Sequence, residues 1–415
     1  MSARSHKRRK PPSLSTKRAV RVFTAALAFC SFLSAEPASA DSYRLRGDVY
    51  AFGMVPAPAG LFTASIQARP TSWADGEAAV WLGGGGTYGD RVGDVLVANV
   101  RLREPHGYGE LRLGRMLIAT GAIRPIQIDG ASVTARVPRG PSLQVFGGAP
   151  VEPGFDTKAF DWALGGRLGQ RIGEYGGVGV SYLQRRTEGR LDFEELGFDA
   201  ALSPFRWLDA SADVAVDLLR PAITSGRASL ALRYKSVRLE LFGLRRSPSR
   251  LLPATSLFAA IGDVPSDQGG ATFWLRAAPR LDLWTTGSVD SIAGNLAGRA
   301  SLHSTLRLND RGDSAVGVEL RRVWVPDNAG WTGGRLIARI PIAYRFQASA
   351  EFELVFPDEA RDRGDVWPWG LGAVTYSPAL APWFNVTAAV EAGASPTRES
   401  NVTGILRASG TWEKL

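Results

Sequence analysis

Apolar and polar residues alternate with a period of two along most of the chain. In residues 208–218, Leu, Ala and Val occupy every even-numbered position, whereas Asp209, Asp213 and Asp217 stand at odd-numbered ones. Successive side chains of a β-strand point to opposite faces, so this run predicts a strand with one apolar and one polar face. The same alternation recurs at residues 62–68, 96–103, 227–234, 299–308, 335–346, 384–390 and 402–412. From residue 41 onward, no stretch carries a comparable helical stripe.

Clusters of Gly, Pro, Asp and Asn separate these runs, as in hairpin connections. They lie at residues 103–107, 137–140, 247–249, 262–267, 309–312, 326–328 and 358–365. Units of about 20 residues follow, each a strand of about 9–11 residues plus a turn, which is the length of a membrane-barrel strand. The pattern therefore predicts an all-β fold: a single transmembrane antiparallel up-and-down β-barrel of about 18 strands, within a range of about 16–20.

The first 40 residues have a different character from the rest. Eight Lys and Arg precede an apolar stretch at residues 22–33, and Ala38-Ser-Ala40 follows before Asp41. This order is typical of a cleaved secretory signal peptide. A retained membrane anchor is the alternative, but the apolar stretch is short for a membrane span. We expect a leader at residues 1–40 and the barrel at residues 41–415.

Composition supports an exported protein and removes several other classes. The mean hydropathy of −0.06 excludes a helical membrane protein. Loss of the leader removes eight bases and one acid, so the formal net charge of +9 falls to +2 and gives no reason to expect nucleic acid as a partner. Cys30, the single cysteine, leaves with the leader, so no disulfide framework is expected.

Aromatic residues stand near the beginnings and ends of the alternating runs. In a bilayer they would form two girdles at the membrane interfaces, whereas in a soluble sandwich they would belong to the core. The predicted girdle residues are Trp73, Trp162, Trp207, Trp324, Trp331, Tyr344, Phe346, Trp367, Trp369, Trp383 and Trp412.

The pattern resembles a Gram-negative outer-membrane β-barrel over nearly all of residues 43–412. The segment Glu110-Leu-Arg-Leu-Gly-Arg115 is similar to porin-type barrels, and residues 247–263, with Leu252-Pro-Ala-Thr-Ser-Leu-Phe258, are similar to barrels of myxobacterial outer membranes. The resemblance implies a location in the outer membrane. It also implies a partner, because some of those barrels pair with short periplasmic polysaccharide-export proteins that lack a membrane-spanning part.

Candidate catalytic chemistry is sparse. Two histidines remain after the leader: His106 in a Pro-His-Gly turn and His303 on the polar face of its strand. No Gly-x-Ser-x-Gly motif and no set of zinc ligands accompanies them. Glu351 and Glu353 share a strand face and could form a glycosidase pair, but acids on a barrel wall more often line the lumen and pair with Arg. We predict no enzyme, no cofactor and no metal site.

If the apolar face meets lipid, the polar face must line the lumen. The predicted pore-lining residues are Arg101, Arg103, Asp209, Asp213, Arg227, Arg233, Arg299, His303, Arg307, Arg335, Arg339, Arg345, Glu351 and Glu353. Their charges nearly balance, so the pore should be polar without a strong field of one sign. An alternative is that these Arg only pair with lumenal acids and stabilise the wall.

The first functional hypothesis is export of a polysaccharide across the outer membrane, and the second is a passive diffusion porin for small polar solutes. A barrel enzyme or a structural outer-membrane protein is a third class. The expected partners are outer-membrane lipid, a periplasmic polysaccharide-export protein and the polar cargo, whether polysaccharide or small solutes.

Overall fold

The computed structural model describes residues 42–53, 59–85, 92–138, 140–151, 160–246, 266–292, 294–310, 312–327, 329–359, 365–379, 381–395 and 398–414. The predicted leader lies outside these residues. Among the described residues, no helix is long and apolar enough to cross a membrane.

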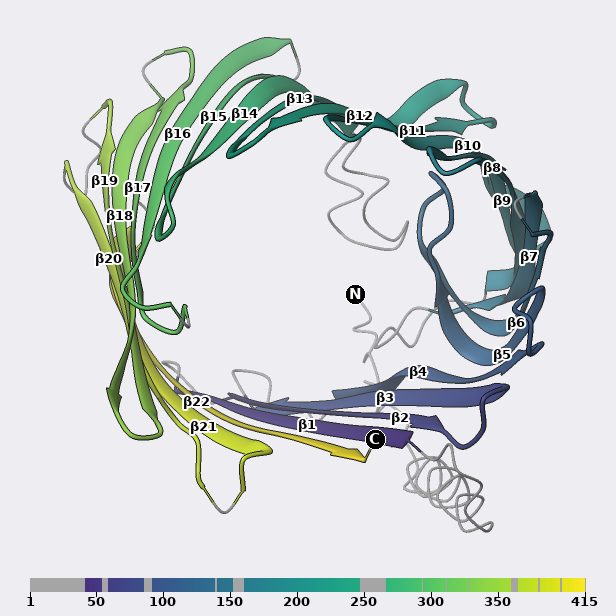
Figure 1. Ribbon diagram of the computed structural model, residues 1–415, viewed down its shortest axis with the longest axis horizontal. Helices are drawn as coiled ribbons and strands as arrows, with labels where there is room; N and C mark the ends of the chain where they lie inside the picture. Colours follow the sequence, from purple (N-terminus) through teal and green to yellow (C-terminus); the bar gives the residue numbers. More distant parts are fainter. Residues whose placement is uncertain are drawn as a thin grey trace, which may run out of the picture.

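The described residues form 22 β-strands (Figure 1). Their bounds are β1 Ser42–Gly53, β2 Ala59–Arg69, β3 Ala74–Gly85, β4 Val92–Arg103, β5 Gly109–Ile118, β6 Ile126–Arg136, β7 Pro141–Pro150, β8 Phe160–Ile172, β9 Gly176–Thr187, β10 Arg190–Phe205, β11 Leu208–Asp217, β12 Ala222–Tyr234, β13 Val237–Arg246, β14 Ser266–Ala278, β15 Leu281–Ile292, β16 Asn295–Arg307, β17 Ala315–Trp324, β18 Trp331–Ala343, β19 Phe346–Pro357, β20 Trp367–Tyr376, β21 Phe384–Ser395 and β22 Arg398–Lys414.

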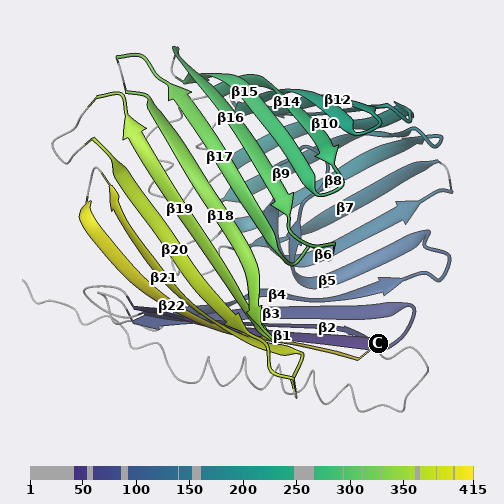
Figure 2. The ribbon, with the colours of Figure 1, turned by 60° about the vertical axis from the view of Figure 1, so that its left-hand side comes forward.

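Each strand pairs antiparallel with the next along the chain, and β22 returns to pair with β1 from Tyr43↔Lys414 to Gly53↔Gly404. The sheet is therefore a closed ring when viewed along its axis (Figure 1), and its strands run obliquely to that axis (Figure 2). Closure leaves no unpaired strand edge, which is a requirement for a sheet inside a bilayer. The predicted all-β class, with a single closed antiparallel barrel, is confirmed.

The predicted strand count of 18, and the range of 16–20, are wrong. Several hairpins turn within two residues at positions that carry no Gly or Pro. Lys235 connects β12 to β13 with a φ of 49°, and Arg345 connects β18 to β19 with a φ of 74°. A positive φ is uncommon for non-glycine residues, so the sequence gives no signal there. The run at residues 335–346 is consequently two strands with a turn, and residues 42–414 average about 17 residues per strand-plus-turn unit instead of about 20.

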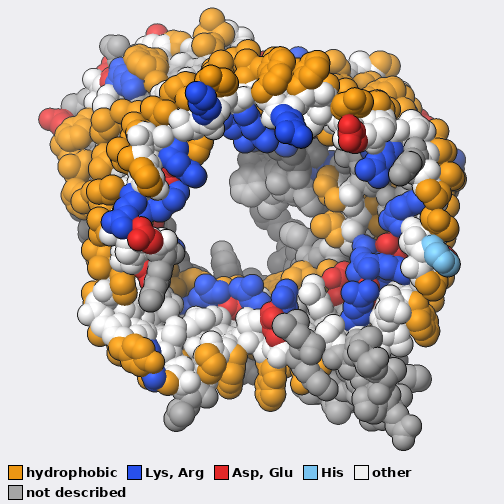
Figure 3. Space-filling model, in the orientation of Figure 1, with side chains coloured by type: hydrophobic (Ala, Val, Ile, Leu, Met, Phe, Trp, Pro, Cys, Tyr) orange, Lys and Arg blue, Asp and Glu red, His pale blue; other side chains and the backbone are white. Residues whose placement is uncertain are grey.

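The two faces of the wall differ in chemistry. On β18, Leu336 is 48% exposed and Ile342 is 59% exposed on the outer face, whereas Arg335 and Arg339 lie on the inner one. In Figure 3, hydrophobic side chains cover the outside of the ring, and Arg and acidic side chains border the opening within it. An apolar outer face beside a polar inner one suits a barrel surrounded by lipid.

One connection folds into the lumen instead of extending from the wall. The segment between β5 and β6, residues 119–125, lies against the inner faces of β9 and β10 (Figure 1). The backbone N–H of Arg124 donates to Glu195 at 2.8 Å, and Ile123 packs into the buried cluster. A Cβ added to Gly197 would stand 2.9 Å from the backbone N of Ile123, so glycine makes room for the segment. The buried cluster is formed by Met116, Ile118, Ile123, Ile128, Phe146, Ala163 and Leu183.

Candidate functional site: the inner wall of the barrel

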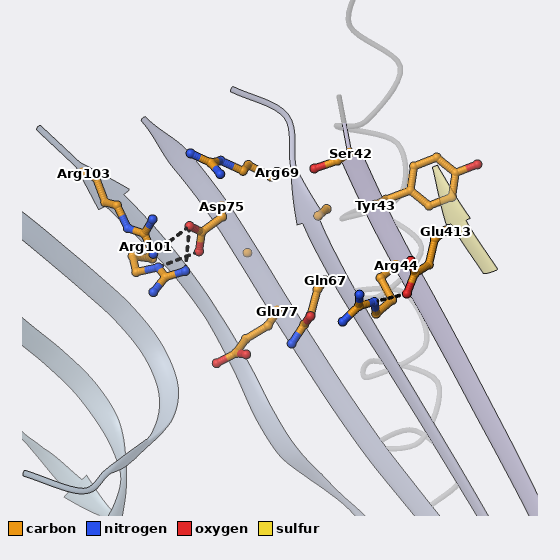
Figure 4. Close-up of a pocket in the computed structure, with 12 residues that line it drawn as sticks. Ser42, Tyr43, Arg44, Gln67, Arg69, Asp75, Glu77, Arg101, Arg103 and Glu413 are labelled. Atoms are coloured by element: carbon orange, nitrogen blue, oxygen red, sulfur yellow. Dashed lines mark hydrogen bonds and ion pairs between the residues drawn. The ribbon is translucent and has the colours of Figure 1, made fainter. Parts of the chain in front are cut away.

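Ion pairs line the inner wall at the end of the barrel where β1 begins and β22 ends. Arg101 donates to both oxygens of Asp75, from Nε at 2.7 Å and from Nη2 at 2.8 Å. Arg103 approaches the same carboxylate at 3.5 Å and Glu110 at 3.8 Å. Asp75 and the two arginines border a cavity of about 340 Å³ formed by β1–β4 and β22, into which Gln67 also points (Figure 4). The sequence prediction identified both arginines but not the acid that they share.

A second set of the predicted residues lies on β11 and β12. Arg233 pairs with Asp209 at 2.6 Å, and the Ser203 hydroxyl donates to the same aspartate at 2.7 Å. Asp213 and Arg227 are direct cross-strand partners. Each predicted acid of this region therefore faces a predicted base on the neighbouring strand.

On β14 to β16 the predicted arginines pair with acids that are almost fully buried. Arg299 contacts Asp290 at 2.8 Å, and Arg307 pairs with Asp282, which also accepts from Arg276 at 3.3 Å. These two aspartates were not among the predicted residues. They occupy the same even-numbered positions of β15 as Thr286 and Ser288, so the period of two could have identified them as inner-face residues.

A larger network spans β16 to β19. Arg335 pairs with Glu351, and Arg321 pairs with Glu353. Glu319 lies 3.3 Å from Arg321. The structure thus brings the predicted residues of β18 and β19 together, and adds Arg321 and Glu319 between them and β16.

The two histidines occupy different environments. His106 is exposed in the β4–β5 connection, where its backbone N–H donates to Glu104 at 2.9 Å and holds the pKa of that carboxyl below its usual range. His303 lies on the inner wall, stacked on Trp284 with ring centroids 4.7 Å apart, and its Nε2 is 3.6 Å from Glu319. The described residues contain no group of three or more His, Cys, Asp or Glu that could hold a metal ion.

Two of the predicted pore-lining residues, Arg339 and Arg345, lie near the end of the wall where β1 begins and β22 ends. Arg339 is on the inner face and donates to the carbonyl of Gly312 at 2.9 Å. Arg345 is a correction: it lies in the two-residue turn after β18 and not on a strand, because the chain reverses there. Its guanidinium covers the ring of Tyr344 at 4.4 Å and lowers the pKa of that phenol.

Aromatic side chains also belong to the inner wall, which the sequence analysis missed. Trp331, Trp367 and Trp369 were expected in the lipid-facing girdles but share the odd-numbered inner face with Arg335 and Glu353. The prediction was wrong because it used position along the strand and ignored the alternation. Trp274 and Trp284 lie on the same inner face, whereas Trp162, Trp324 and Trp412 are on the outer one.

The arrangement offers many hydrogen-bonding groups in charge-compensated pairs. Most of the guanidinium groups lie against a carboxylate on a neighbouring strand, so the wall carries little net charge of one sign locally. Arg presents a planar fork of donors, and carboxylates present acceptors, so the wall can exchange hydrogen bonds with polar groups in the lumen. That these residues line a conducting pore stays a prediction.

No family model matches the sequence, and no curated protein matches it. Among solved structures, the chain is similar to the E. coli P pilus tip assembly intermediate PapC–PapD–PapK–PapG, with 11% identity over 89% of this chain and 60% of that one and a TM-score of 0.53. The translocation pore of the P pilus usher PapC gives 12% identity, coverage of 90% and 99%, and a TM-score of 0.49. The Pseudomonas aeruginosa channel OccD3 (OpdP) gives 12% identity, coverage of 91% for both chains, and a TM-score of 0.43.

Identities this low show a shared fold and nothing finer. The closed 22-strand sheet, the apolar outer face and the polar inner wall define the chain as a β-barrel of the outer-membrane type. The location that the sequence indicated, the outer membrane, is confirmed.

Proposed function

We propose that this barrel exports a polysaccharide across the outer membrane and receives it from a periplasmic polysaccharide-export protein. The observation that supports the proposal is the distribution of charged pairs along the inner wall. They extend from Arg101–Asp75 on β3 and β4 to Arg321–Glu353 on β17 and β19, instead of converging on one enclosed pocket.

Such a wall suits a long polar chain for an energetic reason. Conduction needs binding that is favourable enough for entry and weak enough at each site for release. A guanidinium already paired with a carboxylate gains only part of a hydrogen bond from a passing hydroxyl group. Many exchangeable contacts of this kind would hold a sugar chain in the lumen without arresting it.

The connections suggest which end meets the periplasm. Outer-membrane barrels have short periplasmic turns and longer extracellular loops. At the end where β1 begins and β22 ends, no connection between strands exceeds seven residues, whereas the opposite end has connections at residues 151–159 and 247–265. The cavity beside Arg101 and Asp75 would then lie at the periplasmic mouth, where the export protein would deliver the polymer.

A strain that lacks residues 41–415 tests the proposal. One polysaccharide should be lost from the cell surface while its precursors remain inside, and the intact chain supplied in trans should restore it. Surface staining with extraction of the cell-associated and intracellular polymer measures both quantities. Normal surface polysaccharide in the deletion strain would reject export.

A second candidate is a diffusion porin for small polar solutes. It is favoured by the opening visible within the ring in Figure 3. In that case the same deletion strain should keep its surface polysaccharide but take up small hydrophilic antibiotics more slowly. The two readouts therefore separate the candidates in one experiment.

A further inference from the structure

One row of side chains crosses the inner wall from near one mouth of the barrel to near the other. Its members are direct cross-strand partners on seven consecutive strands, β14 to β20. The row runs Trp274, Trp284, His303, Glu319, Arg335, Glu353 and Trp369. Resting on the proposed function, we infer that this row, hereafter the Trp–Arg row, is a binding track for successive neutral sugar units of the exported chain.

The direction of the row follows from the strand tilt. Trp284 is the fourth residue of β15, close to the end where β1 begins and β22 ends, whereas Trp369 is the third residue of β20 at the opposite end. Neighbouring strands lie about 4.8 Å apart, so six steps cover about 29 Å across the strands. With strands tilted about 35–45°, a row perpendicular to them climbs along the barrel axis. The track therefore advances along the barrel axis, from one end toward the other, while it winds part of the way around the wall.

The side chains of the row are ordered by contacts with one another. The ring of Trp284 stacks on His303 with an angle of 7° between the planes. At the other end, the Trp369 indole N–H donates to Glu391 at 2.8 Å, and the Arg335 guanidinium lies over the same indole at 5.8 Å from its centroid. Trp284 and Trp369 are each only partly buried, so ring surface remains available to the lumen.

The chemistry of the row fits a sugar better than other polar cargo. A pyranose ring has a flat C–H face that packs on an aromatic ring and an edge of hydroxyl groups that need donors and acceptors. The Trp–Arg row supplies indole faces at its two ends and a Glu–Arg–Glu sequence between them. Glu319 and Glu353 both flank Arg335, which also pairs with Glu351, and Arg321 contacts Glu319 and Glu353. Two arginines therefore stand among three carboxylates, and this slight acidic excess favours hydroxyl-rich neutral units over a strongly anionic polymer.

Current blockade by a defined sugar tests the track. The purified full-length barrel is inserted into a planar lipid bilayer, and the neutral glucose hexamer maltohexaose is added on one side. We expect transient blockades whose apparent Kd rises at least tenfold in the double variant Trp274→Ala/Trp284→Ala. The single-channel conductance in salt alone should change little, because neither indole carries charge.

Trp324→Ala is the matched control, because this indole lies on β17 but on the outer face. Maltohexaose should block the current through this variant with the same apparent Kd as in the wild type. Gel mobility that changes on heating shows that each variant has assembled as a barrel. Calorimetric titration of maltohexaose into the detergent-solubilised barrel gives the same comparison without requiring an open channel.

Equal affinity in the wild type and the double variant, or no binding to either, would overturn the track. Separate results would contradict the proposed export and the proposed track. If the row-dependent affinity is present but a deletion strain keeps its surface polysaccharide, the track stands as a sugar-binding site of a barrel that does not export that polymer. If export is lost in the deletion strain while the double variant binds and exports normally, export stands and the track is rejected.

Discussion

The inner faces of β5–β10 and β14–β20 differ in polarity and in exposure to the lumen. On β5–β10, Met116 and Phe146 are at most 1% exposed, because the β5–β6 connection covers them inside the lumen. On β14–β20, the inner face keeps partly exposed charges and indoles, with Arg335 and Trp369 among them. An inward-facing residue is therefore not polar by necessity. It can be apolar where another part of the chain excludes water from it, whereas a polar residue buried there, such as Glu195, is hydrogen-bonded to that segment.

The difference predicts unequal consequences for truncation on the two walls. Phe146→Ala removes a ring that is fully enclosed, so the barrel should lose about 3–5 kcal/mol of stability. Trp284→Ala removes a partly exposed ring and should cost clearly less. Urea unfolding of the purified barrels, followed by heat-modifiable gel mobility, compares the two midpoints. Equal losses would mean that the apolar cluster is not a separate core.

The outer face provides the next largest effect. Leu336→Arg places a charge on the lipid side near the middle of β18, at a cost of about 2–4 kcal/mol. Arg339→Leu changes the inner face of the same strand and should leave assembly nearly unchanged. The amount of assembled barrel in membrane fractions measures both. The reverse ranking would place the inner and outer faces the other way round, since a shift of one residue exchanges them.

Displacing residues 119–125 should expose the inner face of β5–β10 to the lumen, as the inner face of β14–β20 already is. In Gly197→Val, the new Cβ would stand 2.5 Å from the Ser181 hydroxyl oxygen and 2.9 Å from the backbone N of Ile123. Displacement of residues 119–125 should cost about 1–3 kcal/mol, as overpacking does. Single-channel conductance should rise because the segment no longer occupies the lumen. Gly287→Val is the control, because nothing lies within 4 Å of its Cβ position.

The smallest effect on stability should come from the charged network itself. Glu353→Gln removes one carboxylate beside Arg321, where part of the pair is open to water, so stability should change by less than about 1 kcal/mol. Because one negative charge leaves the lumen, the preference of the channel for anions over cations should increase. The reversal potential in a salt gradient reports this shift. An unchanged potential would mean that the permeating ions do not pass near this pair.

Much of the candidate site could be predicted from the alternation alone. Arg101, Arg335 and Glu351 were predicted on a polar face because the direction of a side chain depends only on its position within its own strand. Their ion-pair partners were harder to predict. Asp75 is 26 residues from Arg101 in sequence, and its proximity depends on how β3 and β4 pair. The indoles of Trp331 and Trp369 were misassigned although the same alternation applies to them.

By itself, the sequence determined that the chain is all-β, that it forms a barrel and that its strands have two different faces, because a period of two is a local property of each strand. The tertiary structure decided the number of strands, since the turns at Lys235 and Arg345 require positive φ values that cannot be predicted from these residue types. It also decided that residues 119–125 enter the lumen and that the Trp–Arg row forms one line. The row depends on the register of each consecutive strand pair from β14 to β20, and the inward segment depends on its contacts with β9 and β10. Neither is a property of one strand alone.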